Sequence, residues 1–436
     1  MLYVCASPIL VVDTNGKSYA WELISGWNAC NASGACFSPG VSCFVASRQF
    51  YRKLNMNPYQ PKRPHILFLF SDTGGGHRSA TEAIIEAIHL EFGEQIITEK
   101  VDFFKEYAPP FFRKMPDWWP HIVRPPQSYA YGLGFHLSDG PAQVRFLVDT
   151  AWPYVRKAAR KLVEDHPSDL IVSLHPVANA PMLRILGDHR PPFVTVVTDL
   201  VTTHAFWFHP RADLCIVPTE DARERALRYG MRPEQVKVIG LPVADRFCQP
   251  PCLREAIRSR LGWPQDRPVI VLVGGGEGMG PLEEIASAIA DAHLQAALVI
   301  ITGRNQKLRE RLSTRSWPMP TFIDGFVREM PDYMAAADIL VTKAGPGTIS
   351  EAFNAGLPLI LYNRLPGQEE GNVTYVVEKA AGVWAPHTDL IVSVLQSWIE
   401  HPEQRAKAAA ACRRLARPHA ARQIARALAA RIGLDA

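Results

Sequence analysis

Short apolar runs alternate with helix-length amphipathic segments along most of the chain. From His65 onward the runs are HILFLF, DLIVSL, FVTVVT, DLCIVP and VKVIG, and the last of them ends at Gly240. Each run is too short for a buried helix and is rich in β-branched residues, as strands covered by helices on both faces are. The pattern predicts a parallel sheet with crossover helices.

The same alternation begins again in the second half of the chain. After the charged helical stretch LREAIRSRLG, four more runs follow: PVIVLVGGG, AALVIITG, DILVTKAG and LPLILYN. Two such series predict an α/β protein with two doubly wound, Rossmann-like domains that face a central cleft. We place the first domain at residues 61–250, the second at residues 251–415, and a C-terminal helix that packs back across the cleft at residues 416–436.

Residues 1–60 do not share this alternation. They are rich in Ser, Asn, Gly and Cys and end in the loop-like NMNPYQPKRP, so we expect a poorly ordered extension. The first apolar run has no basic residues before it and is interrupted at Asp13, which argues against a signal peptide. Four cysteines in this segment form no CxxC pair, and free thiols in a reducing cytosol explain them better than a zinc site.

Composition excludes some classes of protein. Of the 436 residues, 47% are hydrophobic and 21% are charged, and 47 basic against 43 acidic residues leave a formal charge of +4. This charge is too small to indicate a nucleic-acid partner. Since no apolar stretch is long enough to span a bilayer, we expect no transmembrane helix, and any membrane contact should be peripheral, on the cytoplasmic side.

Polar residues follow the predicted strands of the first domain. The first strand leads into SDTGGGHR, where Gly75 and Gly76 allow a ligand to approach the backbone and the next helix offers free N–H groups. His77 is suited to act as a base near neutral pH. Later strands lead to further polar side chains: His175, Asp199 and His204. We expect one site at this edge; tight packing around structural histidines is the alternative.

Glycine loops also follow two strands of the second domain. They read GGGEGMGP from Gly274 and KAGPGTISE from Lys343, and each precedes a helical segment. Two helix N-termini can hold a pyrophosphate through backbone N–H groups, and no DxD pair at a strand end offers a divalent-ion site. The later cluster PGQEEGN suits hydroxyl recognition. Because no acidic residue follows a GxGxxG turn, a dinucleotide-dependent oxidoreductase is disfavoured.

Aromatic and basic side chains are concentrated in residues 103–135, which hold ten aromatics. Rings among basic residues suit an anionic lipid surface, and we predict membrane contact through Arg113, Lys114, Trp118 and Trp119. A folded subdomain with aromatic core, or stacking on single-stranded nucleic acid, would also use such residues. The arginine-rich tail is a second candidate for anionic lipid.

Several segments in series resemble a known family. They include SDTGGGHRSATEAI, VTDLVTTHAFWFHP, GGGEGMGP, TKAGPGTISEA and GQEEGNVTYVVE, which are similar to segments of monogalactosyldiacylglycerol synthases and the related bacterial diacylglycerol glucosyltransferases. The resemblance covers about residues 64–430. It implies a GT-B fold and an inverting transferase that moves a hexose, galactose favoured, from a UDP-sugar to diacylglycerol at a membrane surface. We expect no metal or other cofactor.

The resemblance also implies roles for residues. His77 would be the general base and Asp199 the next candidate, beside Gly75, Gly76, His175 and His204 on the acceptor side. Phe326 and Val327 would lie near uracil, and Glu351 near the ribose. The complete set expected around the donor is Gly274, Gly275, Gly276, Glu277, Arg304, Phe326, Val327, Lys343, Gly345, Gly347, Thr348, Glu351, Gln368, Glu369 and Asn372.

Departures from the family pattern leave alternatives open. Plant members usually carry GQEAGN where this chain has Glu370, and TDLSTCHPTWFH where it has TDLVTTHAFWFH. A diacylglycerol glucosyltransferase, possibly processive in its sugar addition, and an N-acetylglucosaminyl transferase acting on a polyprenyl-linked precursor are competing enzymes. An inactive lipid-surface scaffold is the alternative from another class. The oligomeric state is open.

Overall fold

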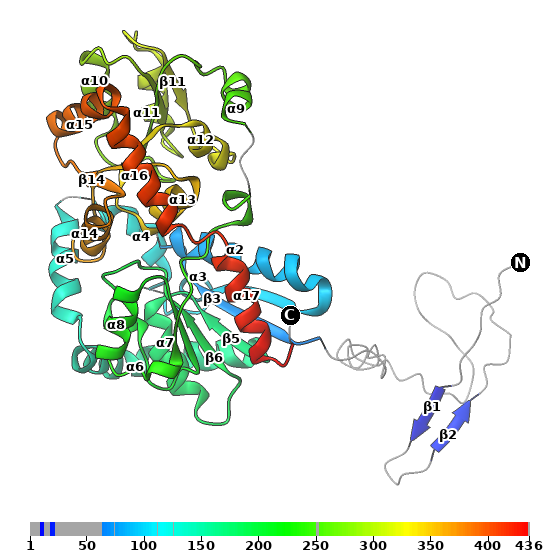
Figure 1. Cartoon of the computed structure of the whole chain (residues 1–436). Helices are drawn as coiled ribbons and strands as arrows, with labels where there is room; N and C mark the ends of the chain where they lie inside the picture. Colours follow the sequence, from blue (N-terminus) through cyan, green and yellow to red (C-terminus); the bar gives the residue numbers. More distant parts are fainter. Residues whose placement is uncertain are drawn as a thin grey trace, which may run out of the picture. The chain divides into compact units, whose positions relative to one another are not determined.

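The computed structural model describes residues 9–12, 18–21, 63–73, 75–110, 112–124, 126–249 and 253–434 (Figure 1). The chain falls into two units, Met1–Lys62 and Arg63–Ala436. In the first unit, strands β1 (Ile9–Val12) and β2 (Ser18–Trp21) pair antiparallel. The remainder of the extension predicted for residues 1–60 lies outside the described residues.

The second unit begins with an N-terminal sheet of parallel strands, in the order β4-β3-β5-β6-β7-β8. The predicted apolar runs of this region are strands. The sequence pattern missed β4, whose outer residues are partly exposed because it lies at the sheet edge. The strands are β3 (His65–Phe70), β4 (Ile97–Asp102), β5 (Leu170–Ser173), β6 (Phe193–Val196), β7 (Leu214–Val217) and β8 (Val236–Val238).

Helices cover both faces of this sheet because alternate residues of a strand point to opposite sides. Ile66 and Phe68 join the core under α2 and α17, whereas Leu67 and Leu69 join the core under α6, α7 and α8. The helices of this half are α2 (Gly76–Phe92), α3 (Phe103–Glu106), α4 (Met115–Ile122), α5 (Gln127–Ser138), α6 (Pro141–Asp165), α7 (Pro176–Leu186) and α8 (Glu220–Arg228). Short 3-10 turns are η1 (Gly93–Gln95), η2 (Phe112–Lys114), η3 (Ala205–Trp207), η4 (Pro233–Gln235) and η5 (Asp245–Phe247).

A second parallel sheet, the C-terminal sheet, has the order β11-β10-β9-β12-β13-β14. Its strands are β9 (Val269–Val273), β10 (Ala297–Ile301), β11 (Thr321–Asp324), β12 (Ile339–Lys343), β13 (Leu359–Asn363) and β14 (Gly382–Trp384). Its helices are α9 (Arg254–Leu261), α10 (Leu282–Asp291), α11 (Gln306–Ser313), α12 (Met330–Ala336), α13 (Pro346–Ala355), α14 (Glu370–Glu378), α15 (Thr388–Glu400) and α16 (Pro402–Leu415). The two doubly wound sheets confirm the predicted fold class.

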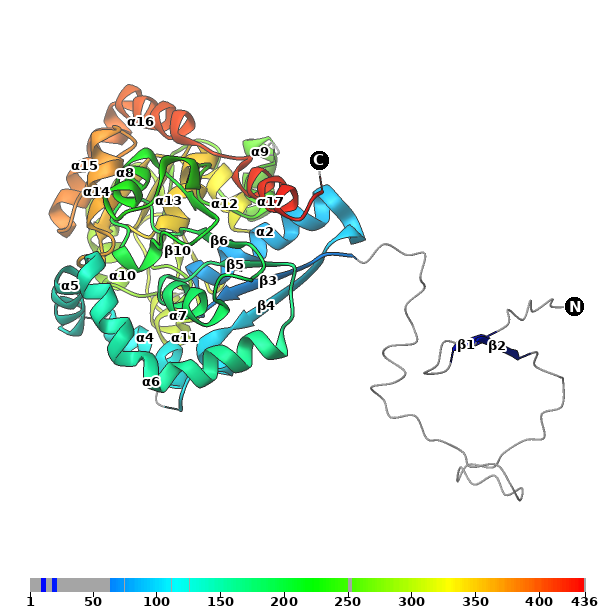
Figure 2. The same cartoon turned by 90° about the horizontal axis from the view of Figure 1, so that it is seen from below.

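The final helix, α17 (Ala420–Arg431), returns to the N-terminal sheet, where it lies beside α2 (Figure 2). Its apolar face, which includes Ile424 and Leu428, is fully buried against that core. On the polar side, Arg422 pairs with Glu91 of α2 and with Asp245 of η5. The chain therefore passes from the N-terminal sheet to the C-terminal sheet and back, and the packing of α17 links the end of the chain to the N-terminal sheet.

None of the helices in the described part of the chain combines the length and the apolar character that crossing a membrane requires.

Candidate functional site

The residues predicted on the acceptor side all follow carboxyl ends of strands in the N-terminal sheet. Gly75, Gly76 and His77 follow β3, whereas His175 follows β5 and Asp199 follows β6. Gly75 has φ 76°, in the left-handed region that favours glycine. A Cβ added at Gly75 or Gly76 would meet no heavy atom within 4 Å. The backbone at the start of α2 is therefore open to a ligand.

His77 lies at the centre of this edge. Its Nδ1 is 2.9 Å from the Thr198 hydroxyl oxygen, and its ring centroid is 4.6 Å from that of His175. Burial lowers the pKa of His77 to about 4, although a hydrogen bond with the backbone of Leu174 acts in the opposite direction. The imidazole is therefore neutral at neutral pH, which is the state that a general base requires.

His175 is more deeply enclosed. Its Nε2 is 3.1 Å from the Thr73 hydroxyl oxygen, and the rings of Phe103 and Phe104 meet it edge-on at 5.2 and 5.6 Å. Burial, with the nearby His77, holds the pKa of His175 well below its usual range. Within the described residues, its buried Nδ1 has no hydrogen-bond partner. A neutral imidazole with one open nitrogen thus lies next to His77.

Asp199 is a buried carboxylate that joins the two halves of the second unit. One of its oxygens accepts from Trp207 Nε1 at 2.6 Å and the other from Gln368 Nε2 at 2.7 Å. Burial raises the pKa of Asp199 to about 6, although these two hydrogen bonds act to lower it. The Gln368 amide also accepts from the Tyr131 hydroxyl at 2.8 Å. Sequence reasoning missed Tyr131 altogether.

His204 uses both ring nitrogens in contacts within the N-terminal half. Nδ1 accepts from the backbone N–H of Phe206, and Nε2 is 3.1 Å from the Ser138 hydroxyl oxygen. The Phe135 ring lies 4.8 Å from the imidazole. His204 thus joins the end of α5 to the loop after β6, and its acceptor-side role stays a prediction.

The donor-side residues follow the carboxyl ends of five strands in the C-terminal sheet. Arg304 lies after β10 and Phe326 after β11, and the guanidinium is stacked 4.7 Å from the phenyl centroid. Arg304 also pairs with Glu277 of the first glycine loop. Phe326 remains 53% exposed. This exposed aromatic and cationic pair offers a flat surface beside Gly276, whose added Cβ would lie 3.7 Å from Arg304.

The first glycine loop passes very close to the loop after β10. A Cβ on Gly278, which has φ 60°, would lie 1.9 Å from the Thr302 carbonyl oxygen, so only glycine fits. Gly275 also has positive φ, 73°, whereas a Cβ on Gly274 would lie 2.4 Å from the Met279 carbonyl oxygen. The glycines of this turn therefore serve its tight packing as well as any ligand.

The second glycine loop follows β12 and begins α13, with Gly345 at the N-cap. A Cβ added at Gly347 would meet no heavy atom within 4 Å, so this helix start is open. Lys343, the last residue of β12, pairs with the buried Glu369 at 3.0 Å. Thr348 lies in the first turn. Backbone N–H groups, a helix dipole and one ammonium group thus occur together.

Two more donor-side residues have unusual environments. Burial raises the pKa of Glu351 to about 7, although the charge of Arg246 acts to lower it. Asn372 is buried and donates to the Ala344 carbonyl oxygen at 2.9 Å, but its own side-chain oxygen has no partner among the described residues. Val327 follows Phe326 in the loop after β11. A polar group with an open acceptor therefore lies next to the second glycine loop.

Two family profiles match the chain. Residues 77–243 match the profile described as monogalactosyldiacylglycerol (MGDG) synthase, and residues 269–427 match the glycosyltransferase family 28 C-terminal domain. MGDG synthase 1 of Arabidopsis thaliana is 37% identical over 363 residues, which are 79% of this chain and 67% of that protein. MGDG synthase 2 of the same plant is 36% identical over 370 residues, 82% of this chain and 78% of that protein. The chain belongs to the MGDG synthase family.

Similar solved structures agree with the GT-B fold that we predicted for this chain. A complex of Staphylococcus aureus MnaA with UDP has a TM-score of 0.58 at 15% identity and covers 85% of this chain and 97% of its own. MurG of Acinetobacter baumannii has a TM-score of 0.53 at 14% identity and covers 84% and 99%. At these identities the likeness shows the fold alone.

The segments that depart from the plant pattern of the MGDG synthase family contact each other across the two halves. Thr202 accepts a hydrogen bond from the Gly371 N–H at 2.9 Å. Glu370, at the start of α14, lies 3.4 Å from His136 of α5. The two segments thus meet where the loop after β6 touches the loop after β13.

The residues predicted to contact a membrane lie in η2 and α4. Arg113 and Lys114 are exposed, but Trp118 and Trp119 are only partly exposed. Trp119 meets the Tyr131 ring edge-on at 5.4 Å. More large apolar side chains are exposed on the neighbouring helices α5 and α6, and we name this set the α5–α6 face; spacing by four residues on α5 could have revealed its members there. Its residues, each at least 40% exposed, are Tyr129, Leu133, Leu137, Phe146, Leu147 and Tyr154.

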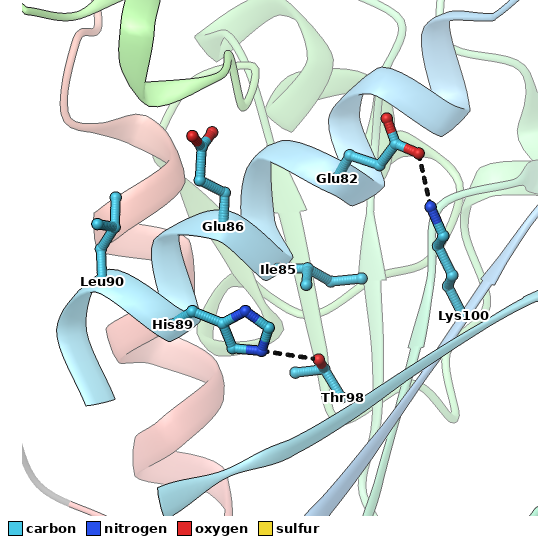
Figure 3. A pocket seen from close by; sticks show the side chains of 7 residues that line it. All are labelled: Glu82, Ile85, Glu86, His89, Leu90, Thr98 and Lys100. Carbon is cyan, nitrogen blue, oxygen red and sulfur yellow. Dashed lines mark hydrogen bonds and ion pairs between the residues drawn. The ribbon is translucent and has the colours of Figure 1, made fainter. Parts of the chain in front are cut away.

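A pocket of about 480 Å³ between α2 and the edge strand β4 lies apart from these residues (Figure 3). Four of its polar side chains bond each other in pairs: Lys100 donates to Glu82 at 2.6 Å, and His89 lies 3.2 Å from the Thr98 hydroxyl oxygen. No residue that follows a strand's carboxyl end lines it. The strand ends remain the candidate site.

Proposed function

We propose that this protein is an inverting glycosyltransferase that moves galactose from UDP-galactose to the hydroxyl of 1,2-diacylglycerol at a membrane surface. One observation carries the proposal. A neutral histidine and a buried aspartate end the strands of one sheet, and Gln368 from the other sheet's glycine-rich edge reaches that aspartate. The names of the plant relatives support a galactolipid product. The UDP bound by a protein of the same fold supports the donor.

The donor would lie along the C-terminal sheet. Backbone N–H groups of the loops at Gly274–Gly276 and Gly345–Thr348, together with Lys343, would hold the pyrophosphate. Arg304 and the backbone of Phe326 and Val327 would hold uracil. Glu351, Gln368, Glu369 and Asn372 would contact ribose and sugar hydroxyls. Among the described residues, no group of three His, Cys, Asp or Glu side chains is arranged to hold a metal, and a metal-free donor site stays part of the proposal.

His77 would take the proton from the acceptor hydroxyl while that oxygen attacks the anomeric carbon. Direct displacement from the side opposite UDP inverts the configuration of that carbon. The leaving UDP oxygen gains negative charge, which the N–H groups at the start of α13 and the Lys343 ammonium stabilise. His77 suits the base better than Asp199, because its imidazole is neutral at neutral pH and it directly follows the open backbone at Gly75 and Gly76.

Diacylglycerol would enter from a bilayer in contact with the α5–α6 face. The exposed apolar side chains of this face can enter the headgroup region. The exposed basic residues of α6 include Arg145, Arg156 and Lys157, which can attract anionic lipid. This face adds to Arg113 and Lys114 as the proposed peripheral membrane surface, which we propose lies on the cytoplasmic side.

The test is a reconstitution of the full chain with vesicles that contain diacylglycerol, with and without anionic lipid. UDP-galactose, UDP-glucose and UDP-N-acetylglucosamine are supplied in separate reactions, and lipid products are analysed by mass and anomeric configuration. We expect β-monogalactosyldiacylglycerol, formed faster with anionic lipid. If only glucolipid forms, glucose replaces galactose as the transferred sugar in the proposal. If none of the three donors yields a glycolipid, the proposal is overturned.

A further inference from the structure

Helix α5 packs directly against the loop after β13, residues 364–369. A Cβ added at Gly132 of α5 would lie 2.6 Å from the Pro366 Cβ, and one added at Gly367 would lie 3.0 Å from the Phe135 Cβ. Gly367 has φ 80°, which also favours glycine. The absence of side chains at both positions brings helix and loop into close contact. This loop carries Gln368, the proposed sugar-binding amide.

Three side chains form a directed chain of hydrogen bonds at this contact. Tyr131 donates its hydroxyl hydrogen to Gln368 Oε1, and Gln368 Nε2 donates to Asp199. An ionised carboxylate can only accept, so the nitrogen end of the amide must face Asp199. The oxygen end then faces the phenol, which can donate to it. The order of the three groups therefore determines the orientation of the amide.

The surroundings hold Tyr131 as a donor. Trp119 packs edge-on against its ring at 5.4 Å, and Phe135 lies 6.2 Å away. Burial raises the pKa of Tyr131, and the negative charges of Asp199 and Glu369 raise it further. The phenol therefore keeps its proton at neutral pH. Its hydroxyl is a fixed donor.

We propose that Tyr131 is a positioning residue that sets the Gln368 amide for selection between donor sugars that differ in the orientation of one hydroxyl. A primary amide has two N–H hydrogens and two lone pairs. Asp199 accepts one of these hydrogens, and the Tyr131 hydroxyl donates to one of the lone pairs. The directions of the remaining N–H hydrogen and the remaining lone pair are therefore set. Without the phenol the amide can turn about its terminal torsion, which is soft. This inference rests on the proposed function, because it assumes that Gln368 contacts the sugar.

The decisive variant is Tyr131→Phe, which keeps the ring packed against Trp119 and removes only the hydroxyl. We expect the ratio of kcat/KM for UDP-galactose to that for UDP-glucose to fall about 3- to 10-fold, the range for one hydrogen bond. In a Gln368→Ala background the same change should have no further effect on this ratio. Tyr107→Phe is the matched control, since its phenol bonds Asp165 and His166 and the ratio should stay unchanged.

An unchanged ratio in Tyr131→Phe, or an equal further fall in the Gln368→Ala background, overturns the inference. Calorimetry of UDP-galactose and UDP-glucose binding without acceptor distinguishes failure of the inference about Tyr131 from failure of the proposed function. If the wild-type chain transfers neither sugar, the proposed function fails, whereas the ratio of binding constants still tests Tyr131. A wild-type chain that binds both sugars equally well, or neither, overturns the inference as well.

Discussion

The carboxyl edges of the two sheets present different kinds of chemical groups. At the N-terminal sheet, the edge consists of buried titratable side chains, and burial shifts the pKa values of His77, His175 and Asp199. At the C-terminal sheet, it consists largely of glycine loops and helix N-termini, with Lys343 among them. Proton transfer needs groups whose protonation is tuned, whereas an anionic leaving group needs fixed dipoles. The difference fits the proposed function, in which each sheet serves one half of the same reaction.

The largest expected effect breaks the N-terminal edge. His77→Ala should lower kcat by about 100-fold to 10,000-fold, the usual range for loss of a general base. UDP binding should be unchanged, because the proposed donor site lies along the other sheet. His89→Ala, near the other end of α2, is the matched control. The measurements are initial rates and calorimetry with UDP. Near-full activity in His77→Ala, with the fold intact by circular dichroism, would remove the base assignment.

The next effect breaks the C-terminal edge. Lys343→Met should weaken UDP binding about 10- to 100-fold, as expected for the loss of a charge-assisted hydrogen bond. Because Glu369 loses its partner, thermal unfolding is measured in parallel, and Lys343→Met/Glu369→Gln restores the charge balance without restoring affinity. Arg311→Met, which removes an exposed ion pair with Glu283, should leave binding unchanged. Tight UDP binding by both Lys343 variants would contradict the prediction.

A third change concerns the α5–α6 face, which only the N-terminal half possesses. Leu133→Ser/Leu137→Ser should lower binding to anionic vesicles about tenfold, because each exposed leucine loses part of the roughly 1.5–3 kcal/mol that full burial provides. Co-sedimentation measures the bound fraction. Leu90→Ser, at an exposed leucine outside this face, is the control. Stronger loss of binding in Trp118→Ala than in the double variant would shift the membrane surface to α4.

The smallest expected effect is a pH dependence of kcat/KM that arises from the titratable groups at the edge of the N-terminal sheet. Asp199 has a pKa of about 6 and His77 a pKa of about 4. As pH falls through about 6, Asp199 gains a proton and ceases to be a pure acceptor for Gln368, so kcat/KM should fall several-fold. A steeper fall should follow near pH 4, where His77 becomes protonated. Asp199→Asn should lack the first decrease; a profile equal to the wild type would contradict this assignment.

Predictability differs between the interiors and the edges of the sheets. The central strands follow from buried β-branched runs such as FVTV and VIVLV. The edge strand β4 is exposed or half-buried over its first four residues, and the edge strands β11 and β14 have no fully buried run, so their sequences lack that signal. The candidate site was predictable in part, because parallel strands bring His77, His175 and Asp199 to one edge whatever their separation in the chain.

The sequence by itself determined the two wound sheets, the glycine loops at their carboxyl ends and the polar residues beside them, because local periodicity and strand direction carry that information. Only the tertiary structure decided that Tyr131 meets Gln368, 237 residues away, and that Gln368 meets Asp199, 169 residues away. It also decided that Trp119 packs inward while Leu133 and Leu137 face outward. The physical reason is that contacts between two sheets depend on how their surfaces dock, and no local pattern encodes that docking.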